Sequence, residues 1–582
     1  MKKRIVSLVL AGLMTAIAIT GCGGAADGGQ TAASSDSSAS TATESSSSDT
    51  AAAAGDYAET ITIDFYDVAA NYQGIQSGWY GKVLKDKFNI ELNIIAPQVG
   101  GGDLYQTRCA AGNLGDLVIL DNGDMMECVE AGLILDMTDL LPTSENLMKF
   151  ESQIKLFNDM VADGTKIYAI PLEMNNNGPT AYKDAHVYTY PRMPWDFYTE
   201  VGAPKLENTT DLLNCLKLIQ DAHPTNENGD PAYAISMWPD WDSQYMENVA
   251  QLTKWYGQEV NGSVLIGTDN SIVPLTDKDA AYYKMLHFFY EANQMGLVDP
   301  DSATQDWNNI VAKHSEKRIY LMWYSWQYGF WNSPERGNSR ENFIEIPVGD
   351  TNLYQPSNTY YGDGRVLGIG SGVEGEKLDR IMAFLDWYAS PEGVQMQHGG
   401  TEGLIYTVGD DGKYTLTDAG QVRFSSEVMV PEEMGGGNWN DGNNAINQWI
   451  VAAVDTNPDT GEPYDTTLWA SSIEMNQTTT TKEWTEMFGA ADDVDYLSKN
   501  GLMTFVASVN VALEIDTTDI SLIRNQCGDL IKDSSWKMVY AKNDAEFDQL
   551  WDDMCTQLEG FGWSDLVAFD TNKYQPVIAA RK

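Results

Sequence analysis

Residues 61–123 alternate between segments with strand and helix patterns. The run ITIDFYDV at 61–68 is rich in β-branched and aromatic residues, and the helical pattern WYGKVLKDKF follows it at 79–88. A second strand pattern, IELNIIAP, occupies 90–97, and a further helix and strand lie within 103–123. Alternation of this kind is typical of parallel βαβ units. The sequence therefore predicts an α/β fold with a parallel sheet.

Three residues stand at the expected carboxyl ends of these strands. Tyr66 and Asp67 end the first strand pattern, and Asp121 ends the strand within 103–123. In open parallel sheets, ligands bind beyond the carboxyl ends of the strands. We therefore expect these three side chains to contact a ligand.

Helical patterns dominate much of the remaining chain. Apolar residues recur at helical spacing in NTTDLLNCLKLIQDAH at 208–223, in TDKDAAYYKMLHFFYEANQMG at 276–296 and in GEKLDRIMAFLDWYASPEG at 375–393. The amphipathic segment DAEFDQLWDDMCTQLEGFG lies at 544–562. These patterns predict a helix-rich C-terminal third.

The N-terminus combines a charged start, a short apolar run and one cysteine. Basic residues at 2–4 precede an apolar run over 5–19, which is shorter than the roughly 20 residues of a spanning helix. We expect residues 1–21 to be a cleaved secretory signal. The ITGC junction at 19–22 resembles a bacterial lipobox, which implies a diacylglyceryl anchor on Cys22. An ordinary signal peptide with a chance cysteine is the alternative.

Small and polar residues fill the segment that follows. Residues 23–56 contain only Gly, Ala, Ser, Thr, Asp, Glu and Gln, so they cannot bury enough apolar surface to offset the entropy of ordering. We expect 22–56 to be a lipidated, disordered tether. The body over 57–582 is long enough for two large cores.

Charge and cysteine content narrow the functions open to this body. The formal net charge of −48 argues against nucleic acid and anionic lipid surfaces as partners, because both require clustered cations. The five cysteines after Cys22 are scattered and form no CxxC pair. They support neither a disulfide framework nor a zinc ribbon.

Several motifs, taken in order, give the body a family resemblance. They are GDLVIL at 115–120, AGLILDMTDLL at 131–141, DGTKIYAIP at 163–171, VGAPKLENTTDLLNCLKLIQDAHP at 201–224, DRIMAFLDWYASPEG at 379–393 with HGGTEG at 398–403, and LEGFGWSDLV at 558–567. This series resembles the extracellular solute-binding lipoproteins of carbohydrate ABC importers, in particular the long oligosaccharide-binding group of the family 1 type.

The resemblance implies a two-lobe, periplasmic-binding-protein-like α/β fold with a hinge and a central ligand cleft. We expect the N-lobe to comprise about 57–173 and a returning segment at about 335–380. The C-lobe would comprise about 174–334 and about 381–582. The resemblance also implies no catalysis, no cofactor and usually no metal. It implies an oligosaccharide ligand, a membrane permease as partner, and a location on the extracellular face of the bacterial cytoplasmic membrane.

Aromatic residues bracketed by polar ones are the main ligand candidates, because sugars offer apolar ring faces and hydroxyl edges. The loop SMWPDWDSQY at 236–245 and the cluster IYLMWYSWQYGFW at 319–331 carry most of them, and GGGNWNDGNN at 435–444 carries another. The predicted ligand-binding residues here are Trp238, Trp241, Trp323, Tyr324, Trp326 and Trp439. Weaker candidates are Trp79, Arg365 and Glu402.

Three other motifs carry little weight. GSGVEG at 370–375 is a lone GxGxxG match. DTNPDTG at 455–461 has alternating oxygen donors, but its glycine comes one place late for a calcium loop and no glutamate follows at the twelfth position. The five histidines show no paired spacing that would suit a metal.

Four functions stay open on the sequence alone. The first is a receptor that captures an oligosaccharide, and the second is a secreted glycoside hydrolase, whose cleft also needs aromatic rings and acids. The third keeps the fold but binds a peptide or another cationic solute. The fourth is a surface adhesin for a glycan.

Overall fold

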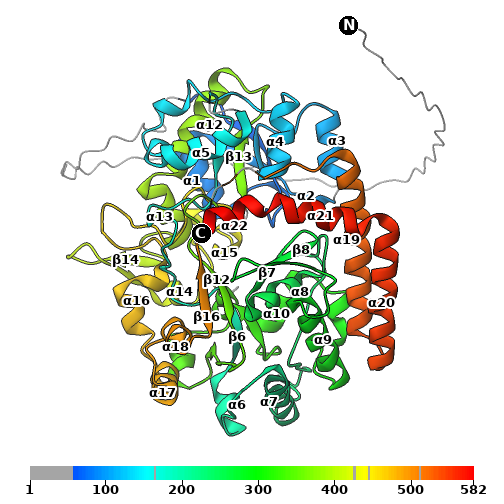
Figure 1. The fold of residues 1–582 in the computed structure, drawn as a ribbon. Coiled ribbons are helices and arrows are strands. Elements are labelled where there is room, and N and C mark those ends of the chain that lie inside the picture. The colour runs from blue at the N-terminus through cyan, green and yellow to red at the C-terminus, as the bar shows by residue number, and fades with distance from the viewer. Residues whose placement is uncertain are drawn as a thin grey trace, which may run out of the picture. The chain divides into compact units, whose positions relative to one another are not determined.

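A computed structural model gives the fold of the chain (Figure 1). It describes residues 57–101, 103–162, 165–423, 428–443, 446–509, 511 and 513–582. The predicted signal peptide, Cys22 and the predicted tether lie outside the described residues. Among the helices that the structure does describe, none has the length and apolar character needed to span a bilayer.

A six-stranded sheet forms the framework of the first half of the chain. Its strand order is β2-β3-β1-β4-β13-β5. The strands are β1 (Ile61–Asp67), β2 (Gly74–Ile75), β3 (Ile90–Ile95), β4 (Leu117–Asp121), β5 (Ala169–Pro171) and β13 (Arg365–Ile369). β1 is parallel to β3 and β4, whereas β13 returns from far along the chain and is antiparallel to β4 and β5. The predicted α/β fold with a parallel sheet is confirmed.

Neighbouring residues on a strand point to opposite faces of the sheet, and here side chains on both faces are buried. Ile63 and Phe65 of β1 belong to a core that also contains side chains of α1 (Gly78–Phe88) and α12 (Gly375–Tyr388). Tyr66 points the other way, into a smaller core with α4 (Asn122–Glu130). We call the larger of these two the first core.

Shorter sheets and many helices form the rest of the molecule. The strands are β6 (Thr189–Pro194), β7 (Gln258–Asn261), β8 (Val264–Gly267), β9 (Ile272–Pro274), β10 (Met322–Tyr324), β11 (Phe343–Glu345), β12 (Leu353–Pro356), β14 (Tyr406–Val408), β15 (Tyr414–Leu416) and β16 (Met503–Val506). β6 lies between β10 and β11, antiparallel to both, and β12 pairs in parallel with β16. β14 and β15 form a hairpin.

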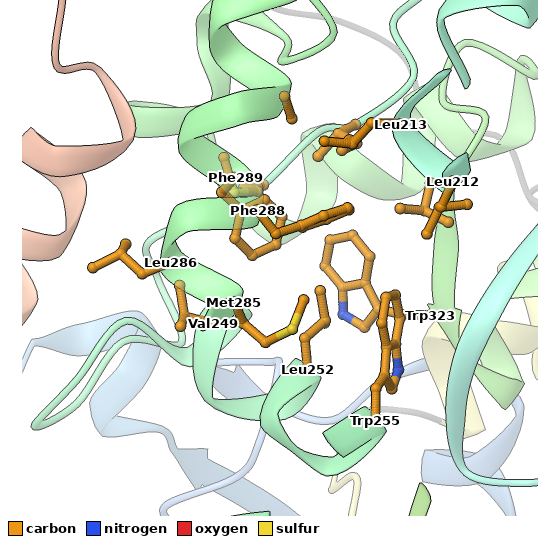
Figure 2. Close-up of a cluster of buried hydrophobic side chains, with 14 of the residues drawn as sticks. Leu212, Leu213, Val249, Leu252, Trp255, Met285, Leu286, Phe288, Phe289 and Trp323 are labelled. Atoms are coloured by element: carbon orange, nitrogen blue, oxygen red, sulfur yellow. The ribbon is translucent and has the colours of Figure 1, made fainter. Parts of the chain in front are cut away.

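A second hydrophobic core lies among the helices around these sheets. The helices include α6 (Trp195–Glu200), α7 (Thr209–Ala222), α8 (Glu247–Leu252), α9 (Ala281–Gln294) and α10 (Trp307–Ser315). Figure 2 shows part of this core, in which Phe288 and Phe289 of α9 lie near Leu213 of α7 and near Trp255 and Trp323. Its apolar residues come from segments that are far apart in the sequence, so the core joins them into one body.

The C-terminal region consists mainly of helices, as the sequence predicts. α19 (Thr518–Val539) and α20 (Asp544–Phe561) lie side by side, and α21 (Trp563–Lys573) and α22 (Gln575–Arg581) complete the chain (Figure 1). Arg524 of α19 forms hydrogen-bonded ion pairs with Asp570 of α21 and with Asp516, at 2.6 and 2.5 Å. Asp570 is fully buried, so this pairing is well shielded from water.

The first and second cores divide the chain differently from the boundaries we expected. The expected C-lobe included residues from 381 onward, but buried side chains over 381–464 pack in the first core with those of 63–174. Conversely, 343–353 was expected in the N-lobe, and its buried residues belong to the second core. The reason is that α12 continues directly from β13 and covers the sheet that β13 completes.

Candidate functional site

Five aromatic side chains form one array, which we call the aromatic site. They are Tyr188, Trp241, Trp307, Tyr324 and Trp326. The Tyr324 and Trp326 rings are stacked, with centroids 5.0 Å apart and planes 16° apart, and Trp241 lies 4.8 Å from Trp307. Tyr188 and Trp326 keep 43% and 38% of their surface exposed. The site therefore exposes the rings of Tyr188 and Trp326 to solvent, and the buried ring of Tyr324 packs against both of them.

Local hydrogen bonds hold this array in place. β10 ends at Tyr324, and the chain turns at once into a 3-10 helix over Ser325–Phe330. The buried Gln327 side chain accepts hydrogen bonds from the backbone N–H groups of Trp323 and Tyr324, each at 2.9 Å. The Ser325 N–H donates to the carbonyl of Tyr188 at 2.9 Å. These bonds fix the turn that carries Trp326.

We call a second group, of charged side chains that influence the ionisation of Glu173, the Glu173 cluster. It comprises Glu173, Asp184, Asp363 and Arg365. Burial, reinforced by the neighbouring aspartates, raises the pKa of Glu173 well above its usual range, whereas Arg365 opposes this rise. Burial also raises the pKa of Asp184 to about 6. Burial therefore disfavours the ionised forms of the Glu173 and Asp184 carboxyl groups.

Glu173 also has an unusual backbone. Its φ of +60° lies in the left-handed region, which residues with a side chain seldom adopt. Its N–H donates to the Trp449 carbonyl at 2.8 Å, and its own carbonyl accepts from Thr359 Oγ1 at 2.7 Å. Strained backbone of this kind is common at functional sites.

Electrostatic influence links the Glu173 cluster to the aromatic site. Burial raises the pKa of Tyr188, whereas the positive charge of Lys254, the Trp326 indole and, more weakly, the positive charge of Arg365 lower it. Arg365 begins β13 of the six-stranded sheet, while Tyr188 and Trp326 belong to the region of the second core. The positive charge of Arg365 therefore acts on Tyr188 across the two regions.

A buried ionic network lies behind the same region. His186 Nδ1 lies 2.8 Å from Asp493 Oδ1 and 3.6 Å from Glu345 Oε1, and Arg192 Nε donates to Glu345 Oε1 at 2.7 Å. Burial alone would lower the pKa of His186, but the two carboxylates raise it to about 9.

One ligand atom from each of His186, Glu345 and Asp493 falls within 4.8 Å of the others, close enough to hold a metal ion. A protonated imidazole has no lone pair to offer a metal, however, and the Glu345 carboxylate already accepts a hydrogen bond from Arg192. The network balances its charges without an ion.

The structure brings together only some of the residues that the sequence nominated. Trp241, Tyr324 and Trp326 share the aromatic site, and the charge of Arg365 lowers the pKa of Tyr188 in the same site. Arg365 Nε is 3.8 Å from Asp121 Oδ1. Arg365 acts to lower the pKa of Asp67, which has no exposed surface in this structure, and contact of Asp67 with a ligand stays a prediction.

The other nominated aromatic residues are packing residues. Trp238 and Trp323 are 1% exposed and stack on each other at 5.4 Å, beneath the aromatic site. Trp79 and Trp439 are stacked at 5.8 Å inside the first core, where the Trp79 indole N–H donates to the Trp439 carbonyl at 2.8 Å.

Tyr66 is buried in the core on the opposite face of the sheet. Glu402 is exposed and lies in the wall of a separate cavity. Of the nominated residues outside the aromatic site, Trp238 contacts it from beneath, with its ring 5.2 Å from Trp241 and 4.9 Å from Trp307. Trp79 and Trp439 pack in the first core, and β-strand geometry turns Tyr66 to the opposite face of the sheet.

Sequence reasoning missed several residues of the site. Glu173 follows β5 as Asp67 ends β1, so the strand-end rule could have nominated it. Asp184 and Tyr188 lie in AYKDAHVYTY at 181–190, which has the same mixture of aromatic and acidic residues as the loops that were chosen.

Comparisons with known proteins agree with this architecture. The chain is 22% identical to the fructooligosaccharide ABC transporter substrate-binding protein FusA of Streptococcus pneumoniae over 254 residues, which is 41% of this chain and 44% of that relative. The match thus spans less than half of the relative's length.

Two solved structures share the fold over a longer stretch. FusA in complex with kestose has a TM-score of 0.60 at 17% identity, with 89% of this chain and 99% of that chain covered. An HMO binding, ABC-transporter associated solute binding protein from Bifidobacterium longum infantis has a TM-score of 0.55 at 15% identity, with 90% and 100% covered. The model of the bacterial extracellular solute-binding proteins matches residues 69–395, more than half of the chain. The chain belongs to this family.

Proposed function

We propose that the protein captures an oligosaccharide outside the cell and delivers it to the permease of an ABC importer. The observation that carries this proposal is the aromatic site with the Glu173 cluster beside it. Exposed Tyr188 and Trp326 suit the apolar faces of sugar rings, and the carboxyl groups and Arg365 suit their hydroxyl edges.

The charge of the site favours a neutral ligand. The Glu173 cluster holds three acidic side chains and one arginine, and Asp121 adds a further carboxylate next to Arg365. A polyuronate or a phosphorylated sugar would meet repulsion there. The carboxyl oxygens and the Arg365 guanidinium together offer acceptors and donors to the hydroxyl groups of an uncharged sugar.

The relatives support the same class of ligand. FusA carries a fructooligosaccharide name and was solved with kestose, and the Bifidobacterium protein is described as HMO binding. The identities are too low to carry a specific sugar over, so the proposal extends to the class of neutral oligosaccharide.

We also infer that the two cores belong to two lobes that close around the ligand. The chain passes between the cores three times, within 174–187, 353–366 and 464–484. Asp184 and His186 lie in the first passage, and Asp363 and Arg365 lie in the second. Hinge segments that carry binding residues would couple ligand contact to closure.

Isothermal titration with a panel of neutral oligosaccharides, including kestose, tests the ligand class. We expect at least one member to bind with micromolar or tighter affinity. Trp326→Ala should weaken that binding about tenfold or more, because an aromatic contact is lost. Phe561→Ala is the matched control, since Phe561 is 40% exposed on α20. Equal loss in both variants, or none in Trp326→Ala, would contradict the assignment of the site.

The same titrations separate the alternatives. Binding of cationic peptides with no response to any glycan would favour the peptide or cationic-solute reading. Chromatography of each bound sugar after prolonged incubation tests for turnover, and a shortened product would favour the glycoside hydrolase. A sugar-uptake defect on deletion distinguishes import from adhesion.

We propose that a lipid on Cys22 anchors the protein to the outer face of the cytoplasmic membrane. Only the lipobox-like junction at 19–22 supports this part of the proposal. Labelling of a bacterial culture with radioactive palmitate should mark the wild-type protein and not Cys22→Ala. Equal labelling of both would rule the anchor out.

A further inference from the structure

A cavity of about 420 Å³ lies outside the aromatic site and the Glu173 cluster. Its wall comes from α13 (Pro391–Gly399), from the loop at 400–402, from the β14–β15 hairpin and from the loop at 457–459. Ligand pockets usually measure about 300 to 1,000 Å³. The cavity is therefore large enough for a small ligand, and no residue of its wall belongs to the site described above.

Hydrogen bonds organise this wall before any ligand arrives. Asn457 is 2% exposed; its Nδ2 donates to Tyr414 Oη at 3.1 Å, and its Oδ1 accepts from the Asp459 N–H at 2.9 Å. Glu462 accepts from the Tyr414 N–H at 3.0 Å, which ties the hairpin to the same loop. The Tyr406 and Tyr414 rings meet edge to face at 5.1 Å.

The loop at 455–461 is the DTNPDTG motif that the sequence offers as a weak calcium candidate. Its oxygen donors are used within the protein: Asp455 accepts from the Asn176 amide at 2.9 Å, and Asn457 accepts from the backbone. The loop therefore serves as part of the cavity wall and does not form an open ring of oxygen ligands.

The polar groups of the wall define the chemistry of a ligand. Glu402 and Asp459 are exposed carboxylates, and Glu392 is paired with Lys87 at 2.7 Å, so an anionic ligand would be repelled. The wall also contains an amide, Gln395, whose Nε2 is buried and has no hydrogen-bond partner among the described residues. An ammonium ion only donates hydrogen bonds, so it can bond to the carboxylates and amide oxygens of this wall but to none of its amide N–H groups.

A hydroxyl group both donates and accepts, so it can bond to the carboxylates and to the amides of the same wall. The Tyr406 and Tyr414 side chains add aromatic surface for an apolar ring face. We propose that this cavity is a second carbohydrate site, which binds one ring of a neutral sugar independently of the aromatic site.

Ligand-observed NMR with the methyl glycosides of glucose, galactose, mannose and fructose tests this proposal. Saturation transfer to at least one glycoside should occur with the wild type and equally with Trp326→Ala, in which the aromatic site is impaired. Glu402→Ala should reduce the transfer at least fivefold. Glu433→Ala, at another exposed acidic position, is the matched control.

Asp459→Ala provides a second variant, and circular dichroism confirms that each variant is folded. Absence of transfer from every glycoside at millimolar concentration would overturn the proposal. So would a signal that Trp326→Ala abolishes, because the sugar would then occupy the aromatic site. If the cavity binds choline or Ca²⁺ in place of a sugar, and Glu402→Ala abolishes that binding, the ligand is a cation and the proposal is overturned. Oligosaccharide titration of Trp326→Ala reports on the proposed function separately.

Discussion

Replacement of Asp67 by asparagine should stabilise the protein at neutral to alkaline pH. Asp67 ends β1, has no exposed surface and accepts a hydrogen bond from the Ala69 N–H at 2.8 Å. Its Oδ2 has no hydrogen-bond partner among the described residues. Burial raises the pKa of Asp67 to about 7, although the Ala69 N–H and Arg365 act to lower it.

The sign of the effect follows from linkage. A carboxyl group with a higher pKa in the folded protein destabilises the fold once it is ionised, so stability falls as pH rises from the unfolded pKa of about 4 to the folded value. One pKa unit corresponds to about 1.4 kcal/mol, so the destabilisation above pH 7 is on the order of 4 kcal/mol. Asparagine is never ionised. Its advantage should therefore grow by about 2 to 3 kcal/mol between pH 5 and pH 8.

Urea unfolding followed by tryptophan fluorescence at these two pH values measures the difference. Asp64→Asn is the matched control, because Asp64 lies on the same strand, is partly exposed and accepts a hydrogen bond from Asn93 at 2.8 Å. The control should gain no stability at pH 8. If Asp67→Asn shows the same free-energy change at both pH values, the buried carboxyl group is not titrating as argued.

Three other perturbations address the ionic network, the first core and a close backbone approach. Burial lowers the pKa of His186 but its carboxylate partners raise it to about 9, so their stabilising effect is complete at pH 6 and should disappear as pH rises through 9. Denaturation at pH 6 and pH 10 should show this loss in the wild type and not in His186→Gln. Trp439→Ala removes a ring stacked at 5.8 Å on a second buried tryptophan, and calorimetry should show a loss of about 3 to 5 kcal/mol. Gly393→Ala would place a Cβ 1.9 Å from the Trp387 carbonyl oxygen and should lower the Tm, whereas Gly560→Ala, with no atom within 4 Å, should not.

Local periodicity was sufficient to predict the first strands and helices. The expected strand at 61–68 is β1, and the expected helix at 79–88 is α1 with one residue added. These elements are set by neighbours along the chain, so a sequence pattern contains the necessary information. The antiparallel return of β13 depends on pairing across more than 240 residues, counted from β4, and no local pattern reports it.

Exposure of individual aromatic residues could not be predicted in the same way. Trp323 and Trp326 are three residues apart in one cluster, yet the first is 1% and the second 38% exposed. Trp79 and Trp439 stack although 360 residues separate them. Burial of this kind is decided by tertiary contacts, so composition identified an aromatic-rich chain and only the fold showed which rings remain accessible.

The interleaving of the two cores has a consequence for biogenesis. The first core needs side chains from 63 to 464, and the second needs side chains from 187 to 566. When the chain emerges N-terminus first, neither core can be completed until most of the chain has been exported. Long-range contacts of this type slow folding. We expect the emerging polypeptide to depend on chaperones at the cell surface. We also expect that proteolytic cleavage at any single position would not release a fragment that folds on its own.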